Sequence, residues 1–160
     1  MITDAKTIDL RAEIVIRMKT VGSHTQMGQV LTGAGWTLKL PEGWTDQREA
    51  GQHLLVPPDG GPPVSIRTAR ANGGMTEKDL RLFARDLIED GYEPEKAKLG
   101  DFEGLAFRYL EDNLYARHWY VQSGRLRLEI NYDCPEDYQG THHDVVDKML
   151  DSLAADASTA

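Results

Sequence analysis

Two histidines and an aspartate near the C-terminus have a spacing that could begin a metal site. His143 and Asp147 are four residues apart, so a helix would place them on one face. Imidazole and carboxylate groups of this kind bind transition metals. The pair His143 and Asp147 supplies only two ligands, and two ligands at this spacing are common by chance. We therefore interpret His143 and Asp147 as a surface pair on a helix and expect no stoichiometric metal and no cofactor.

The other candidates for catalysis are His118 and Cys134. A nucleophile–base pair at His118 would need a serine or cysteine brought close in space. The sequence contains no Gly-x-Ser-x-Gly motif and no glycine loop of the phosphate-binding kind. No lysine or arginine beside Cys134 lowers its thiol pKa. We predict that His118 is a hydrogen-bonded sheet residue, that Cys134 lies in the core, and that no residue is catalytic.

Arginines are frequent in the segments that should form a sheet, although the chain has a net charge of −8. Guanidinium groups that share a face bind carboxylates through paired hydrogen bonds. The competing interpretation is that each arginine pairs with an acid on the next strand, such as Glu129. The candidates for binding a protein partner are Arg67, Arg117, Arg125 and Arg127.

The amino-acid composition limits the class of protein to which this chain can belong. The chain has 160 residues, of which 40% are hydrophobic and 28% charged, so one globular domain is expected. The negative charge argues against nucleic-acid and membrane partners. Charged residues interrupt the first twenty positions, and no apolar run reaches the roughly 20 residues that span a bilayer. A single cysteine favours a reducing compartment, and we predict a cytoplasmic location.

The first of the elements that must position these side chains is marked by a clear alternation of apolar and polar residues. Apolar residues occupy every second position of residues 8–18, which predicts a strand. Residues 19–34 contain several glycines and predict a linker. Residues 36–40, 53–56 and 64–68 predict strands, and a proline- and glycine-rich turn joins the last two as a hairpin.

A helix and three more strands follow. Thr76 begins a capping box, and Gly91 should end the helix that it starts. Residues 105–110, 114–121 and 125–132 predict strands joined by turns short enough for consecutive antiparallel hairpins. The last of these strands should turn its apolar side chains inward and its polar ones outward.

The chain should close with a second helix. Thr141, with Asp144 three residues later, is expected to cap that helix, and residues 154–160 should fray. The predicted order is β–ββ–α–βββ–α with an extra N-terminal strand, an α/β (α+β) fold in which helices pack on an antiparallel sheet. The tryptophans, which follow strands or turns, should lie in the core. They are Trp36, Trp44 and Trp119.

An ordered set of motifs carries a family resemblance. It consists of WTLKLPEGW at residues 36–44, the helix from Thr76, LGDFEGLAFRY at residues 99–109, and MLDSL at residues 149–153. This set resembles the PsbP-like superfamily, which includes a photosystem II subunit, a yeast Ran-binding import factor and uncharacterised bacterial domains. The resemblance implies an α/β/α sandwich over residues 35–153, preceded by the strand and linker of residues 1–34.

The resemblance also implies a class of function. Members of the superfamily are mostly binding and assembly proteins, and one bacterial branch consists of cytoplasmic chaperones of type VI secretion effectors. We therefore expect a bacterial, non-enzymatic protein-interaction module, a chaperone or an adaptor, whose partner is a protein. One alternative is a small-ligand carrier with an aromatic-lined pocket. The other is a metal-dependent or hydrolytic enzyme that uses His118 or His142 and His143.

Residues 8–18 predict a homodimer. Their apolar face must be covered by a core, and a strand outside the family's set has an open edge that a second copy can pair with. The alternative is that the strand folds back onto its own chain. Light scattering should give the mass of a dimer for the full chain and of a monomer for a chain that begins at Met27. A monomeric full chain at micromolar concentration would contradict the prediction.

Overall fold

The computed structural model describes residues 27–71, 76–138 and 142–156, which form two antiparallel sheets and three α-helices. The main sheet has seven strands in the order β3-β4-β5-β9-β8-β7-β6, and the small sheet has three in the order β1-β2-β10. The main-sheet strands are β3 (Thr45–Glu49), β4 (Gln52–Val56), β5 (Val64–Arg70), β6 (Glu95–Leu99), β7 (Phe102–Glu111), β8 (Leu114–Ser123) and β9 (Leu126–Pro135). The other elements are β1 (Met27–Thr32), β2 (Trp36–Pro41), β10 (Ala154–Ala155), α1 (Glu77–Phe83), α2 (Arg85–Glu89), the 3-10 helix η1 (Glu136–Tyr138) and α3 (His143–Asp151).

Strand β9 lies at the centre of the main sheet and alternates as the sequence predicts. Leu126, Leu128 and Ile130 are fully buried, whereas Arg127 and Glu129 between them are partly exposed. Because successive side chains of a strand point to opposite faces, β9 gives the sheet one apolar face and one polar face.

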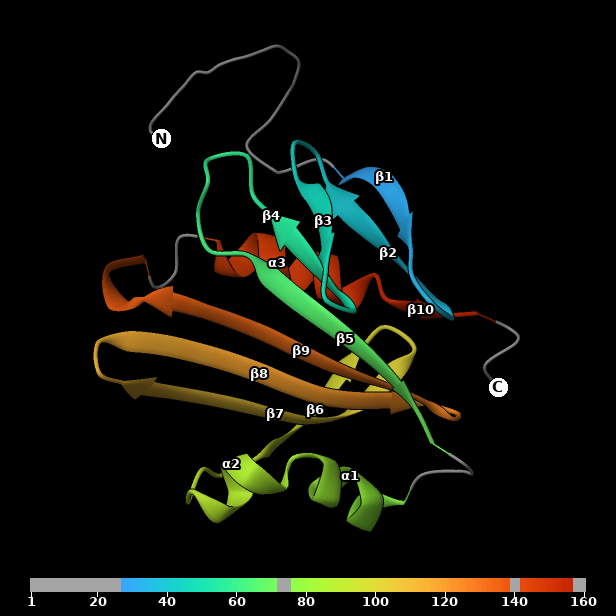
Figure 1. The fold of residues 1–160 in the computed structure, drawn as a ribbon, viewed down its shortest axis with the longest axis vertical. Helices are drawn as coiled ribbons and strands as arrows, with labels where there is room; N and C mark the ends of the chain where they lie inside the picture. The colour runs from blue at the N-terminus through green and yellow to red at the C-terminus, as the bar shows by residue number, and fades with distance from the viewer. Residues whose placement is uncertain (1–26, 72–75, 139–141, 157–160) are drawn as a thin grey trace.

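Each face of the main sheet is covered by different elements (Figure 1). Trp36 and Leu38 of β2 and Met149 of α3 share one buried cluster with the apolar side of β9. On the other face, Leu80 of α1 packs in a second cluster with Phe107 of β7 and other residues of β7 and β8. The predicted architecture, an antiparallel sheet with helices packed on it, is confirmed.

The helices differ in detail from the prediction. The capping box at Thr76 is present, with Asp79 as its partner. The single helix expected up to Gly91 is instead two short helices, separated at Ala84, whose backbone leaves the helical conformation. Helix α3 takes His142 as its N-cap residue, and Thr141 lies outside the described residues.

Two stretches predicted to lack regular structure contain strands. Strand β1 lies within the predicted linker and pairs with β2. Strand β10 lies within the predicted frayed tail and also pairs with β2, with Ala154 opposite Thr37. Backbone hydrogen bonding, rather than an apolar pattern, forms both strands. The predicted strand at residues 8–18 lies outside the described residues, so the homodimer stays a prediction.

Trp36 joins the small sheet to the main sheet. Its side chain is fully buried, and its indole Nε1 donates a hydrogen bond of 3.1 Å to Oγ1 of Thr68 on β5. The edge of its ring also contacts His53 of β4, with ring centroids 5.1 Å apart. Trp44 and Trp119 are buried in the same cluster, so the core positions predicted for the three tryptophans are confirmed.

The position of Trp36 predicts that Trp36→Ala lowers the free energy of unfolding by about 3–5 kcal/mol, because the change removes a large buried side chain and leaves a cavity. Val30→Ala in the neighbouring strand β1 is the matched control, since Val30 is 62% exposed and should change stability by at most about 0.5 kcal/mol. Urea unfolding followed by circular dichroism measures both. Equal midpoints for Trp36→Ala and the wild type would contradict the role given to Trp36.

Candidate functional site

The four predicted partner-binding arginines lie in three different places. Arg67 of β5 and Arg127 of β9 share the face that α1 and α2 partly cover, because Arg67 is paired with Glu129 and Arg127 with Ala69. Arg125 lies in the turn between β8 and β9. Arg117 pairs with Tyr132, whose side chain is on the opposite face.

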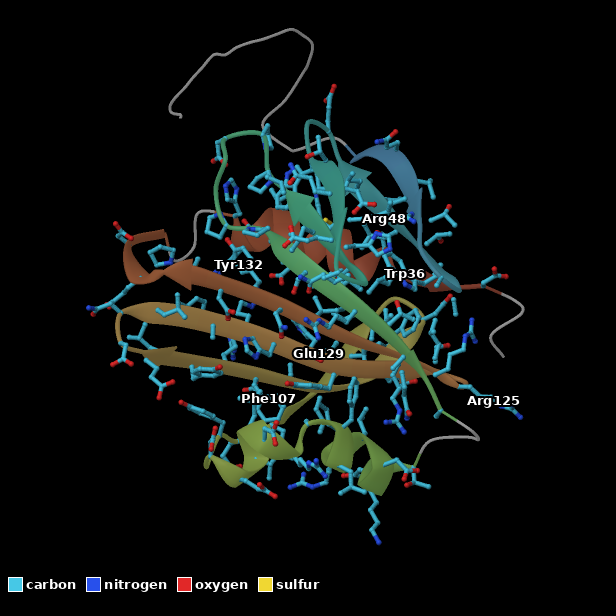
Figure 2. All side chains as sticks on the ribbon, in the orientation of Figure 1. Trp36, Arg48, Phe107, Arg125, Glu129 and Tyr132 are labelled. Carbon is cyan, nitrogen blue, oxygen red and sulfur yellow. The ribbon has the colours of Figure 1, made fainter. Side chains whose placement is uncertain are left out.

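Arg67, Arg125 and Arg127 together form what we call the arginine end of the main sheet. Nε of Arg67 donates a hydrogen bond of 3.3 Å to Gln52 Oε1. The guanidinium of Arg127 lies over the ring of Phe83 in α1, 5.4 Å from its centroid. Arg125 is exposed, and Figure 2 shows its side chain pointing away from the tip of the β8–β9 hairpin. Arg125 and Arg127 therefore lie where β9 begins beside α1, and Arg67 lies further along the sheet, in the middle of β5 and opposite Glu129.

The charge of Arg127 also acts on Asp79 of α1. Hydrogen bonds from the backbone and side chain of Thr76 are the main reason that the pKa of Asp79 is lowered, and the charge of Arg127 lowers it further. The arginine end thus reaches the first turn of α1.

Arg117 lies between the sheet and α3 rather than at the arginine end. Its Nη2 donates a hydrogen bond of 2.7 Å to Oδ1 of Asp147, and its guanidinium lies 4.7 Å from the ring centroid of Trp119. The side chain of Arg117 is only 12% exposed. A partner protein could reach little of it, so its contacts fit a structural link between β8 and α3 better than a docking role.

His143 does not form the predicted surface pair with Asp147. Its ring stacks on Tyr115 at a centroid distance of 5.2 Å and contacts the ring of Tyr132 at 6.2 Å. Burial lowers the pKa of His143, and the positive charge of Arg117 lowers it further. The prediction was wrong because it considered α3 alone, whereas the register of β8 brings Arg117 within reach of Asp147.

The predicted core position of Cys134 is confirmed, since its side chain is fully buried. Burial raises the pKa of the Cys134 thiol, which keeps it protonated and unreactive. Burial also raises the pKa of the neighbouring Tyr132 to about 12. Both groups are neutral members of the core at physiological pH.

His118 is hydrogen-bonded within the sheet, as the sequence predicts. Its Nε2 lies 2.7 Å from Oδ1 of Asp133. The serine of the main sheet that lies level with His118 is Ser65, and it is two strands away, since it pairs with Asn131 and Asn131 pairs with His118. Two strand spacings are about 10 Å, too far for a nucleophile–base hydrogen bond.

The remaining histidine of the enzyme alternative, His142, lies 2.9 Å from a carboxylate oxygen of Asp59 through its Nε2. Among the described residues, no three His, Cys, Asp or Glu side chains are grouped so that they could hold a metal ion. No helix in the described part of the chain is long and apolar enough to cross a membrane.

Comparison with known proteins finds solved structures with a similar fold. No family model matches the chain, and no curated protein matches it. A Bacteroides thetaiotaomicron crystal structure matches with a TM-score of 0.63 and 16% identity over 81% of this chain. LpqN of Mycobacterium tuberculosis, a protein involved in cell envelope biogenesis, matches with a TM-score of 0.53 and 17% identity over 82% of this chain and 91% of LpqN.

Cyanobacterial PsbP from Synechocystis also matches, with a TM-score of 0.43 and 15% identity over 84% of this chain and 98% of that protein. The chain spans about half the length of the Bacteroides protein, 49% of it. The predicted PsbP-like fold is confirmed, and the likeness to the first two structures supports it. At these identities the matches show the fold alone.

The lowered pKa of His143 predicts a loss of stability in acid. The unfolded chain, in which His143 has its ordinary pKa of 6.5, binds this proton more strongly than the folded chain does. The contribution of neutral His143 to the free energy of unfolding is therefore complete above pH 6.5. It is lost as the pH falls from there toward the pKa that His143 has in the folded chain. The drop in unfolding free energy between about pH 7.5 and pH 5.5, measured by urea denaturation, should be smaller in His143→Asn than in the wild type. Equal drops would contradict this.

Proposed function

We propose that this protein is a non-enzymatic protein-interaction module that binds an acidic segment of a partner protein at the arginine end. The observation that carries the proposal is the placement of Arg67, Arg125 and Arg127 on β5, in the β8–β9 turn and at the start of the neighbouring strand β9, in a chain with a net charge of −8. An acidic partner is repelled by the net negative charge of this molecule and attracted by these three arginines, which favours docking at the arginine end.

The accessibility of the arginines supports a protein partner. Arg67 and Arg125 are exposed, and Arg127 is partly exposed beside α1. Guanidinium groups bind carboxylates with two parallel hydrogen bonds, which suits an extended acidic segment. Glu129, which lies directly opposite Arg67, and Asn131 are on the same face of β9 (Figure 2 labels Glu129), so the acidic segment would approach Arg67 from the side of the β8–β9 turn.

A chaperone or an adaptor is the role that this mode of binding suits best. The wide separation of His118 and Ser65 and the buried, neutral thiol of Cys134 favour binding over catalysis. We propose a cytoplasmic location, which a single thiol without a disulfide suits. Likeness to LpqN, an envelope-biogenesis protein, favours the envelope instead, and cell fractionation distinguishes the two locations.

The proposal predicts that Arg67→Glu with Arg125→Glu abolishes capture of the partner while the fold stays intact, because both side chains are exposed. Lys39→Glu with Lys148→Glu is the matched control, with the same change of charge at exposed positions of β2 and α3. Affinity capture from cells with mass spectrometry should recover a partner with the wild type and the control but not with the arginine variant.

A defined probe makes the test independent of the partner's identity. A ten-residue glutamate peptide added to 15N-labelled protein should shift the amide signals of the arginine end. Salt should weaken this binding, since exposed charges are screened over about 10 Å at 0.1 M ionic strength. Shifts that are equal in the wild type and in the Arg67→Glu, Arg125→Glu variant would exclude the arginine end as the binding site.

A further inference from the structure

A cleft of about 600 Å³ that contains two arginines lies where the main sheet meets the small sheet. Strand β5 creates the cleft because it continues past the end of β4. The last pair between these strands is Gln52 with Arg67, so Thr68 and Arg70 extend beyond β4. Ala34, next to the start of β2, borders the cleft from the small sheet.

The turn between β3 and β4 forms another wall of the cleft. Ala50 and Gly51 both have positive φ angles, 48° and 79°, as the tight two-residue hairpin turns require. This turn pairs Arg48 with His53. Paired residues point to the same face of a sheet, so both side chains face the cleft on the side of the small sheet.

Trp36 holds the inner end of the cleft rigid. Its indole N–H donates to the hydroxyl of Thr68, and its ring edge contacts His53. The Thr68 hydroxyl accepts that bond through a lone pair and keeps its own proton for a second acceptor. The ring of His53 is further fixed by Asp46, whose carboxylate oxygen lies 3.0 Å from Nδ1.

The two guanidinium groups of the cleft differ in their partners. Arg48 reaches the carbonyl oxygen of Thr32 at 3.3 Å and Asp46 at 3.5 Å. In the described part of the chain, Arg70 makes no hydrogen bond or ion pair. Among the residues that line the cleft, Glu49 carries a carboxylate, and Arg48 and Arg70 carry guanidinium groups.

We propose that this cleft binds the carboxylate of a small organic acid, with Arg70 as the principal cation, Arg48 as the second and the Thr68 hydroxyl as a further donor. A carboxylate is planar and accepts paired hydrogen bonds from a guanidinium. No side chain of the described residues supplies such a carboxylate to Arg70.

Arg70 lies opposite Leu126, close to Arg125 and Arg127 along the sheet. Its side chain is on the face toward the small sheet, whereas Arg67 and Arg127 are on the other face. This site is therefore separate from the one proposed for a protein partner.

The indole N–H of Trp36 gives a direct measurement, because its partner Thr68 lines the cleft. Succinate titrated into 15N-labelled full-length protein at constant ionic strength should shift the Trp36 indole signal saturably. The indole signals of Trp44 and Trp119, which are buried away from the cleft, serve as internal controls. Sodium chloride at equal ionic strength should cause no saturable shift.

Two variants locate the site. Arg70→Gln should weaken succinate binding about tenfold or more, since it removes a charge-assisted hydrogen bond. Arg125→Gln, a neighbouring exposed arginine outside the cleft, should bind succinate as the wild type does. Equal affinity of Arg70→Gln and the wild type, or no saturable shift with succinate, acetate or citrate, would overturn the proposal.

Two other probes decide between kinds of ligand. Phosphate that binds as tightly as succinate would overturn the assignment to a carboxylate. A glutamate peptide that shifts the Trp36 signal in the wild type but not in Arg70→Gln would assign the cleft to the protein partner and overturn the small organic acid. Unchanged succinate binding in the Arg67→Glu, Arg125→Glu variant should confirm that the two sites are independent.

Discussion

The alternation of side chains along β9 is the constraint on which the rest of the structure depends. Because β9 pairs with both β5 and β8, its fully buried leucines and isoleucine define an apolar face that only α3 and the small sheet can cover. Its other face carries Arg127 and Glu129, and an apolar helix over them would have to desolvate both charges. Helices α1 and α2 accordingly pack over β7 and β8, where Phe107 and Tyr120 supply apolar contacts. The polar half of that face stays open to solvent.

The elements with a buried face could be predicted from the sequence, and those at the margins could not. The strand predicted at residues 125–132 has the apolar period that a central strand requires, and it corresponds to β9. Strands β3 and β6 consist largely of charged and polar residues, and at a sheet edge they contact the core through few side chains. Strand β10 has two alanines, too few to show any period. The helix break at Ala84 was not predicted because the apolar stripe continues through both helices.

The candidate site also has residues whose place could be predicted from the sequence and residues whose place could not. Arg127 could be placed on the open face, because the other face of β9 is wholly apolar. Arg117 could not, because β8 is apolar on both sides near Trp119 and Tyr120, and only its register with Tyr132 decides the face. The cleft at Arg70 depends on where two sheets meet, which is a property of long-range packing. A pattern within one segment contains no signal for it.

The charged edges of the main sheet bear on how the molecule could polymerise. A strand added to β3 would lie beside Arg48 and Glu49, and one added to β6 beside Lys96 and Lys98, so growth of that sheet would bury unmatched charge at either end. The outer strand of the small sheet, β1, has no charged residue and leaves Val30 62% exposed. Fibre-like stacking through the main sheet is therefore disfavoured, and β1 is the edge at which mutations that expose apolar surface would increase the risk of aggregation.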